Sequence, residues 1–175
     1  MNTIIDAMKS RRSIRKYKSA MPEKADIAQI MEAGLYAASG MGKQSPIIVA
    51  VTNKELRDRL SKQNREIWGM PEGFDPFFGA PVVLVVLADK SVPTYVYDGS
   101  LVMGNMMLAA HTLGLGSCWV HRAKQEFESE EGKALLKALG IEGDYEGIGH
   151  CVVGYMAEEL PEARERKTGR VYWAE

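Results

Sequence analysis

Four cationic side chains fall within eight residues near the amino terminus. The stretch SRRSIRKY, residues 10–17, contains Arg11, Arg12, Arg15 and a lysine, with the hydroxyl of Ser13 between them. On a helix or a tight turn, Arg11 and Arg15 lie four residues apart on one side. Guanidinium groups suit planar, bidentate anions such as a phosphate. A solvated basic face is the alternative, and these residues alone leave both interpretations open.

The charge distribution says more than the total charge. The chain has 175 residues and a formal net charge of −1. Residues 1–18 carry six Lys or Arg against one acid, and Arg164, Arg166, Lys167 and Arg170 follow near the carboxy terminus among glutamates. A near-neutral chain whose basic cluster lacks interleaved aromatic residues is a poor nucleic-acid binder. We therefore expect no nucleic-acid partner.

The composition is that of a globular protein. Hydrophobic residues make up 46% of the chain and charged residues 26%, and this length fits one domain over residues 1–175. The apolar run PVVLVVLA, residues 81–88, is much shorter than the roughly 18 residues of a membrane span. The amino terminus lacks the pattern of a signal peptide, and two cysteines make no disulfide framework. We expect a cytoplasmic protein with no membrane partner.

Helical and strand-like segments alternate along the chain, which predicts the α+β or α/β class with a long central helix. Residues 22–38 form an amphipathic helix whose apolar stripe ends at Leu35. Residues 97–116 are apolar almost all round, as in a buried helix, and their small residues would let another helix approach. The other expected helices are 4–10, 54–67 (polar, on the surface) and 126–139, and the expected strands are 47–53, 82–88, 117–120 and 147–156.

Two glycine-containing loops and one Cys/His pair admit further chemistry. The loop ASGMGKQSP, residues 38–46, offers backbone N–H groups to an anion but lacks the end of a Walker loop. The glycines at 114–116 follow a helix, so they do not form a dinucleotide fingerprint. Cys118 and His121 in CWVH could belong to a metal site or a thiol nucleophile. Neither has a second half in the sequence, and we predict no metal site.

The order of these segments resembles the nitroreductase family of FMN-dependent oxidoreductases over nearly the whole chain. The resemblance rests on RRSIRKY, AASGMGKQSP, FFGAPVVLVV, DGSLVMGNMMLAAHTLGLGSCWV and a final basic stretch ending in GRVYW. It implies an α+β nitroreductase-like fold with a mixed, mostly antiparallel central sheet flanked by helices. It further implies a homodimer with FMN at the interface.

The resemblance also implies a set of cofactor-binding residues. The amino-terminal group would hold the phosphate and ribityl end of FMN, and one arginine would lie against the N1–O2 edge of the flavin. The loop after the second helix would come from the partner subunit, and the backbone near residue 121 would approach flavin N5. The terminal basic pair would clamp the phosphate. In this sequence the set is Arg11, Arg12, Ser13, Arg15, Ser39, Gly40, Met41, Gln44, His121, Arg122, Arg164 and Arg166.

The chain departs from the family pattern at several positions. Gly42 stands where many members have an amide side chain, and no lysine occurs in the segment before the 82–88 strand. His121 is a possible pocket residue. Trp68, Phe74 and Phe77 are candidates both for stacking on an acceptor and for core packing.

The expected activity is hydride transfer from NADPH or NADH through flavin N5 to a nitroaromatic, quinone or enone acceptor, by a ping-pong mechanism. A non-catalytic flavin-binding protein, acting in storage or sensing, is one alternative. A metal- or thiol-dependent enzyme around Cys118 is another.

Overall fold

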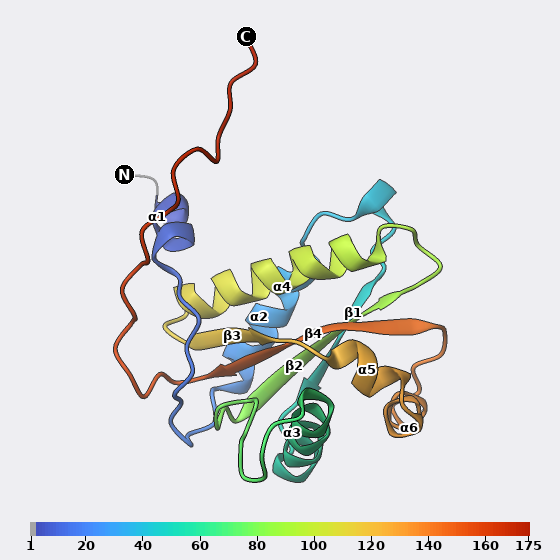
Figure 1. The fold of residues 1–175 in the computed structure, drawn as a ribbon. Helices are drawn as coiled ribbons and strands as arrows, with labels where there is room; N and C mark the ends of the chain where they lie inside the picture. The colour runs from blue at the N-terminus through green and yellow to red at the C-terminus, as the bar shows by residue number, and fades with distance from the viewer. Residues whose placement is uncertain (1–2) are drawn as a thin grey trace.

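One four-stranded sheet organises the computed structural model, which describes residues 3–175 (Figure 1). The strands are β1 (Pro46–Val51), β2 (Val82–Asp89), β3 (Gly116–Val120) and β4 (Tyr145–Gly154), in the order β1-β2-β4-β3. All three strand pairs are antiparallel. An isolated parallel bridge joins Ser13 to Ser117. The sheet is therefore mostly antiparallel, as the resemblance implied.

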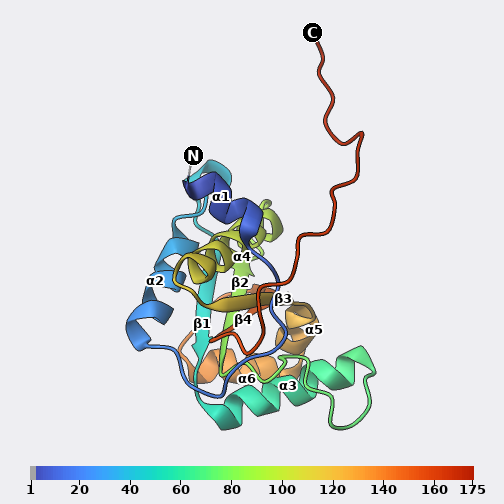
Figure 2. The same ribbon diagram turned by 90° about the vertical axis from the view of Figure 1, so that its left-hand side faces the viewer.

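Helices cover both faces of the sheet. Helices α2 and α4 pack on one face, while α3, α5 and α6 lie on the other (Figure 2). Helix α1 lies over α4, on the side away from the sheet. The helices are α1 (Thr3–Ser10), α2 (Lys24–Leu35), the 3₁₀ turn η1 (Gly40–Gly42), α3 (Lys54–Trp68), α4 (Tyr95–Thr112), α5 (Ala123–Glu128) and α6 (Glu130–Ala138).

Strand β2 is the centre of the core. Its residues from Val82 to Ala88 are 0% exposed, because the strand has neighbours on both edges and helices on both faces. Alternate side chains point to opposite faces, so Val83 and Val85 join the cluster on the α3 side, while Leu84 and Val86 join the cluster on the α4 side. Continuous β-branched and leucine residues are the expected pattern for a strand buried on both faces.

Two glycines allow α4 to pack closely, in a different way from the one expected. A Cβ at Gly34 of α2 would lie 2.7 Å from Met106 of α4, so this glycine lets the two helices approach. A Cβ at Gly99 of α4 would lie 2.6 Å from Ile148 of β4. Gly99 of α4 therefore allows close packing against the sheet. Gly34 of α2 allows close packing between α2 and α4.

The structure corrects three of the sequence predictions. The single helix expected over 126–139 is two helices, because Ser129 adopts extended backbone and accepts a hydrogen bond from Gly132 N as the amino-terminal cap of α6. Leu35, placed on the buried stripe of α2, is 55% exposed. Helix α3 is not simply a surface helix, since it buries Arg57 and Asn64.

The chain ends run side by side before the tail diverges. Lys18 N donates to Tyr155 O at 2.9 Å, and Ala157 N donates to Lys16 O at 3.0 Å. Beyond this pairing, the residues up to 175 are extended and project from the body of the protein (Figure 1). Within residues 3–175, no helix combines the length and the apolar character that crossing a membrane requires.

Candidate functional site

The basic cluster lies on an extended segment that follows α1. Helix α1 ends at Ser10, so the expected helical arrangement of Arg11 and Arg15 is wrong. Ile14 N donates to Ser117 O at 3.0 Å, which fixes the segment along β3, and the Ile14 side chain is 1% exposed. In extended chain, alternate residues share a side. Residues 11, 13 and 15 therefore still project together.

The thiol of Cys118 on β3 is influenced by the same three residues. Burial raises the pKa of Cys118, while Arg15, a hydrogen bond with Ser13 and Arg11 act in the opposite direction. Ser13 therefore lies beside this thiol, and Arg11 and Arg15 are near enough to act on it electrostatically. The net direction is upward, so the thiol stays protonated and is 2% exposed. That environment gives no support to a thiolate nucleophile.

Two guanidinium nitrogens of the cluster are buried without a partner. Arg11 Nη1 and Arg12 Nε each expose less than 1 Å² and form no hydrogen bond with residues 3–175. His111, at the end of α4, contacts Ser10 Oγ through Nε2 at 2.9 Å. Burial lowers the pKa of His111, and Arg11 and Arg12 lower it further. Arg12 Nη1 donates to Lys9 O and Arg11 O, each at 2.7 Å, so this guanidinium group is only partly satisfied. Among residues 3–175, no carboxylate pairs with the side chains of Arg11 or Arg12, and the cluster is a positive field without a protein counter-charge.

The turn after β3 carries His121 and Arg122. Arg122 has φ +80°, a left-handed conformation that is uncommon for a residue with a side chain. Asn64 on α3 is 0% exposed, and its Nδ2 donates to His121 O at 2.7 Å. The His121 side chain is exposed and its ring centroid lies 5.7 Å from that of Trp119. A backbone conformation of this kind is held by its surroundings, and Asn64 supplies part of that support.

A fully buried contact between a carboxyl group and an imidazole lies beneath this turn. His150 Nε2 on β4 is 2.5 Å from Glu126 Oε2 on α5, and both side chains are 0% exposed. The His150 ring packs on Phe77, with centroids 5.1 Å apart. Sequence analysis found no role for Glu126 or His150, because 24 residues separate them in the chain. It left Phe77 open as a stacking residue, and the structure places that ring in the core, at 0% exposed.

The loop around Ser39 lies at the other end of α4. Gly40 N donates to Asp98 Oδ1 at 3.0 Å, and Gln44 N donates to Ser39 Oγ at 3.0 Å. Burial opposes ionisation of Asp98, but hydrogen bonds from Gly40, Ser45 and Thr94 outweigh it and lower the pKa. The carboxylate therefore fixes the start of this loop.

One chain does not bring the loop and the basic cluster together. The loop is tied to Asp98 in the first turn of α4, whereas the cluster adjoins His111 in its last turn. Thirteen residues of α-helix span roughly 20 Å at 1.5 Å per residue. Ser39, Gly40, Met41 and Gln44 are therefore far from Arg11 within a single copy.

The terminal basic pair is also separate from the cluster. Arg164 and Arg166 lie in the exposed tail, beyond the pairing of residues 15–18 with 155–158. Arg15 N donates to Glu158 Oε1 at 3.1 Å, which is where the tail leaves the amino-terminal segment. Among residues 3–175, no three His, Cys, Asp or Glu side chains are arranged to hold a metal ion.

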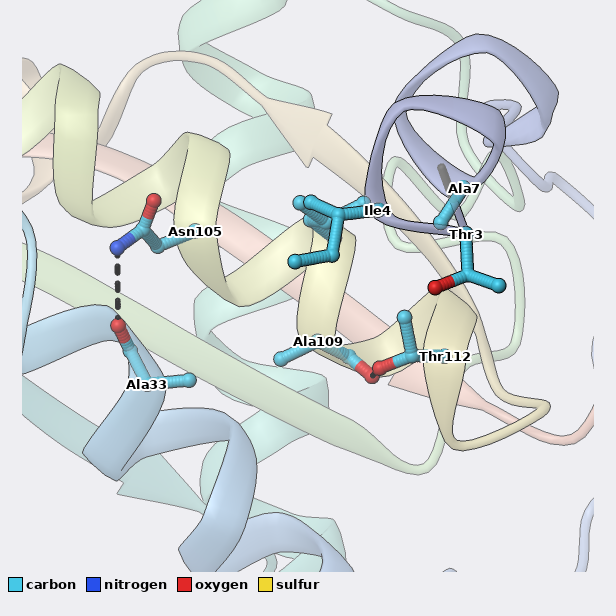
Figure 3. A pocket seen from close by; sticks show the side chains of 8 residues that line it. Thr3, Ile4, Ala7, Ala33, Asn105, Ala109 and Thr112 are labelled. Atoms are coloured by element: carbon cyan, nitrogen blue, oxygen red, sulfur yellow. Dashed lines mark hydrogen bonds between the residues drawn. The ribbon is translucent and has the colours of Figure 1, made fainter. Parts of the chain in front are cut away.

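Apolar side chains of α1, α2 and α4 are exposed on the side of α4 that faces away from the sheet. Figure 3 shows a cavity there, of about 420 Å³, between α1, α2 and α4, with Asn105 Nδ2 donating to Ala33 O at 3.0 Å on one wall. Large side chains on these helices and the following turn are exposed, among them Ile4, Met8, Leu35, Tyr36, Tyr97 and Leu101. Several large exposed apolar side chains on neighbouring helices are typical of an interaction surface.

Comparison with known proteins identifies the class to which this fold and basic cluster belong. The model of the nitroreductase family matches residues 8–155. The chain therefore belongs to the nitroreductase family.

Curated relatives and solved structures agree with this assignment. A protein of Methanothermobacter thermautotrophicus, assigned as an NADH dehydrogenase/NAD(P)H nitroreductase, is 31% identical over 120 residues, which are 66% of this chain and 59% of that protein. The FMN reductase [NAD(P)H] of Bacillus subtilis is 27% identical over 139 residues, 67% of this chain and 53% of the reductase. The chain thus spans under two thirds of the length of these two relatives.

The fold match extends over the entire chain. The nitroreductase of Bacteroides fragilis, solved with bound FMN, has a TM-score of 0.88 and 28% identity and covers 100% of both chains. The nitroreductase of Desulfitobacterium hafniense, also with bound FMN, has a TM-score of 0.89 and 24% identity over 100% of both chains, which shows the shared fold.

Proposed function

We propose that the protein is an FMN-dependent oxidoreductase that takes hydride from NADPH or NADH and reduces a small acceptor in a ping-pong cycle. The supporting observation is the pair of buried, unpartnered guanidinium nitrogens of Arg11 and Arg12. A desolvated cation without a counter-charge is unfavourable, and a phosphate dianion satisfies it. Family membership and the FMN-bound relatives support the same cofactor.

The residues present fit FMN. Arg11, Arg12 and Ser13 hold the phosphate and ribityl end, next to the positive field that also acts on His111. Arg15 projects on the same side and places positive charge at the N1–O2 edge, where reduction adds negative charge. The turn at His121 and Arg122 presents its backbone to N5. Bound FMN supplies reversible two-electron hydride chemistry, so the acceptor can be a nitroaromatic, a quinone or an enone.

We further propose that two copies build each site. The loop that holds Ser39, Gly40, Met41 and Gln44 is at the wrong end of α4 to meet Arg11 of its own chain. A second copy packed on the apolar face of α1, α2 and α4 supplies that loop and covers the exposed side chains. The same partner gives the projecting tail a surface on which Arg164 and Arg166 approach the phosphate.

An absorbance spectrum of the purified protein, repeated anaerobically with NADPH or NADH, tests the activity. We expect flavin bands that bleach on reduction and return when an acceptor is added. Persistent bands would favour the storage or sensing alternative. No bands after reconstitution with FMN would refute the proposed function.

Mixing two inactive variants tests the shared site. Arg11→Glu removes the phosphate site of its own chain, and Met41→Asp places a carboxylate in the loop offered to the partner. Met41 is 83% exposed, so the second variant should fold. A mixed dimer contains one site with both changes and one with neither. Recovery of up to a quarter of the wild-type activity on random mixing supports the proposal, and no recovery contradicts it.

A further inference from the structure

Three aromatic rings form a row that joins two arginines of the site. The Arg122 guanidinium carbon lies 4.3 Å from the centroid of the Trp68 ring. Trp68 contacts Phe74 edge-on at a centroid distance of 5.5 Å, and Phe74 contacts Phe78 at 6.5 Å. Arg15 then lies 5.9 Å from the Phe78 ring. We call Trp68, Phe74 and Phe78 the aromatic row.

The loop that carries the row is anchored by one carboxylate. Asp75 accepts hydrogen bonds from Ser61 Oγ at 2.6 Å, Phe77 N at 2.9 Å and Gly79 N at 2.7 Å, and it pairs with Arg57. Burial opposes ionisation of Asp75, but these bonds outweigh it and lower the pKa of the carboxyl. Trp68 is the last residue of α3. The row is therefore built on a helix end and an anchored loop.

The row lies at the border of the hydrophobic core, against which Phe78 packs. Trp68 is 39% exposed, and Phe74 and Phe78 are half-buried, whereas the adjacent Phe77 is 0% exposed. The chain also accepts φ +56° at Phe78, an unusual conformation for an aromatic residue. Successive rings stand nearly perpendicular to one another, at 83° and 87°, so their partly exposed edges and faces offer apolar contacts to a further ring in the edge-on geometry that aromatic pairs favour.

Arg122 keeps its hydrogen-bonding edge available. Its face stacks on the indole of Trp68, and within residues 3–175 no ion pair or hydrogen bond involves its guanidinium group. Stacking occupies the face of a guanidinium and leaves the N–H fork in its plane. That fork matches a planar carboxylate through two parallel hydrogen bonds. A cation beside an aromatic surface thus recognises an aromatic anion.

We infer that the aromatic row and Arg122 form an acceptor subsite for a planar aromatic carboxylate. The acceptor ring lies on the row and its carboxylate binds the Arg122 fork. This inference rests on the proposed function, which places the flavin between Arg15 and the turn at residues 121–122. With a nitroaromatic acid, reduction of the nitro group to nitroso takes up one hydride, originating from NAD(P)H, and one proton, and releases water.

Ligand binding tests the subsite without turnover. Benzoate, benzamide and benzyl alcohol are titrated against the FMN-reconstituted protein, with tryptophan fluorescence as the readout and Trp68→Phe to identify the signal. We expect benzoate to bind at least tenfold more tightly than the neutral ligands. Arg122→Met should abolish that preference and Arg122→Lys should retain part of it. Arg59 is exposed on α3, the helix that ends at Trp68. Arg59→Met, which removes a charge there, should keep the preference for benzoate.

Acceptor selectivity provides the second readout. The flavin is photoreduced, so that the NAD(P)H step is bypassed, and reoxidation by 4-nitrobenzoate is compared with reoxidation by 4-nitrobenzyl alcohol. We expect the ratio of second-order rate constants to fall about tenfold in Arg122→Met. An unchanged ratio overturns the inference. So does an Arg122→Met effect confined to the NAD(P)H half-reaction, which would assign the guanidinium to the phosphates of the donor.

Failure of the inference and failure of the proposed function give different results. Equal binding of benzoate and benzamide to a protein that bleaches with NAD(P)H refutes the subsite alone. Absence of flavin refutes the proposed function. The same fluorescence titration of flavin-free wild type and Arg122→Met then decides whether the row and Arg122 bind carboxylates.

Discussion

Arg57 and Arg11 both have guanidinium nitrogens hidden from water, yet the surroundings of these two groups differ. Arg57 has a side chain 10% exposed, donates to Ala80 O at 3.1 Å and pairs with Asp58 and Asp75. Arg11 Nη1 is equally hidden and has no partner among the described residues. Arg57 has carboxylate partners within the protein, as expected for a structural cation. Arg11 has none, as expected for a cation that binds a ligand.

The largest expected effect comes from removing the satisfied arginine. Arg57→Met leaves Asp75 partly buried without its counter-charge and releases the loop that carries the aromatic row. Breaking a buried pair by removing one partner costs about 3 kcal/mol. Urea unfolding of the apoprotein measures the loss. A loss under about 0.5 kcal/mol, typical of exposed pairs, would show that this arginine is not structural.

Replacing Arg11, the arginine without a protein counter-charge, should not destabilise the apoprotein. Arg11→Gln removes a desolvated charge that has no protein partner, so the free energy of unfolding of the apoprotein should not fall. The affinity for FMN should drop about 100-fold, which corresponds to about 2.7 kcal/mol. Fluorescence titration with FMN measures the affinity. A variant that binds FMN as tightly as wild type would remove the distinction between the two arginines.

The smallest expected effect concerns His111, whose pKa is lowered by the positive charges of Arg11 and Arg12. Burial, Arg11 and Arg12 lower its pKa, so the neutral ring is favoured in the apoprotein. Any stability that this shift contributes is present above the unfolded pKa near 6.5 and is lost as the pH falls toward the folded pKa. A bound phosphate offsets the two arginines and raises the pKa of His111.

Binding should therefore take up part of a proton. We expect FMN affinity to rise about threefold between pH 7.5 and pH 6.5 in wild type, relative to His111→Gln. The comparison with the variant removes the contribution of the phosphate itself, whose second pKa is near 6. Parallel pH profiles for the two proteins would show that His111 lies outside the field of the bound anion.

The sequence predicts the fold well where local pattern decides it. The buried strand at 82–88 and the apolar helix over α4 follow from runs of apolar residues, and both occur with boundaries shifted by a few residues. Sequence reasoning failed at a cap that interrupts a segment whose residues otherwise favour helix. Ser129 divides the last helical segment because its side chain accepts a hydrogen bond from Gly132 N and caps α6.

Some residues of the candidate site could also be predicted from the sequence, and others could not. The cluster around Ser13 could be found from composition and from the family pattern, and the structure brings Arg11, Ser13 and Arg15 together. The Glu126–His150 pair could not be found, since nothing local signals that either side chain is buried. Among the aromatic candidates, only the folded chain separates Phe77 in the core from the partly exposed Trp68.

The length of α4 has a consequence for how the protein behaves on dilution. If the loop at one end of this helix serves the partner's site and the cluster at the other end serves its own, a dissociated copy retains neither complete site. Specific activity would then fall as the protein concentration drops through the dissociation constant, instead of staying constant. In a mixed dimer with a copy whose cluster cannot bind FMN, the normal copy would still build one complete site from its own cluster and the partner's loop. Activity would then fall only in proportion to the share of defective copies, so a defective allele would not act dominantly over a normal one.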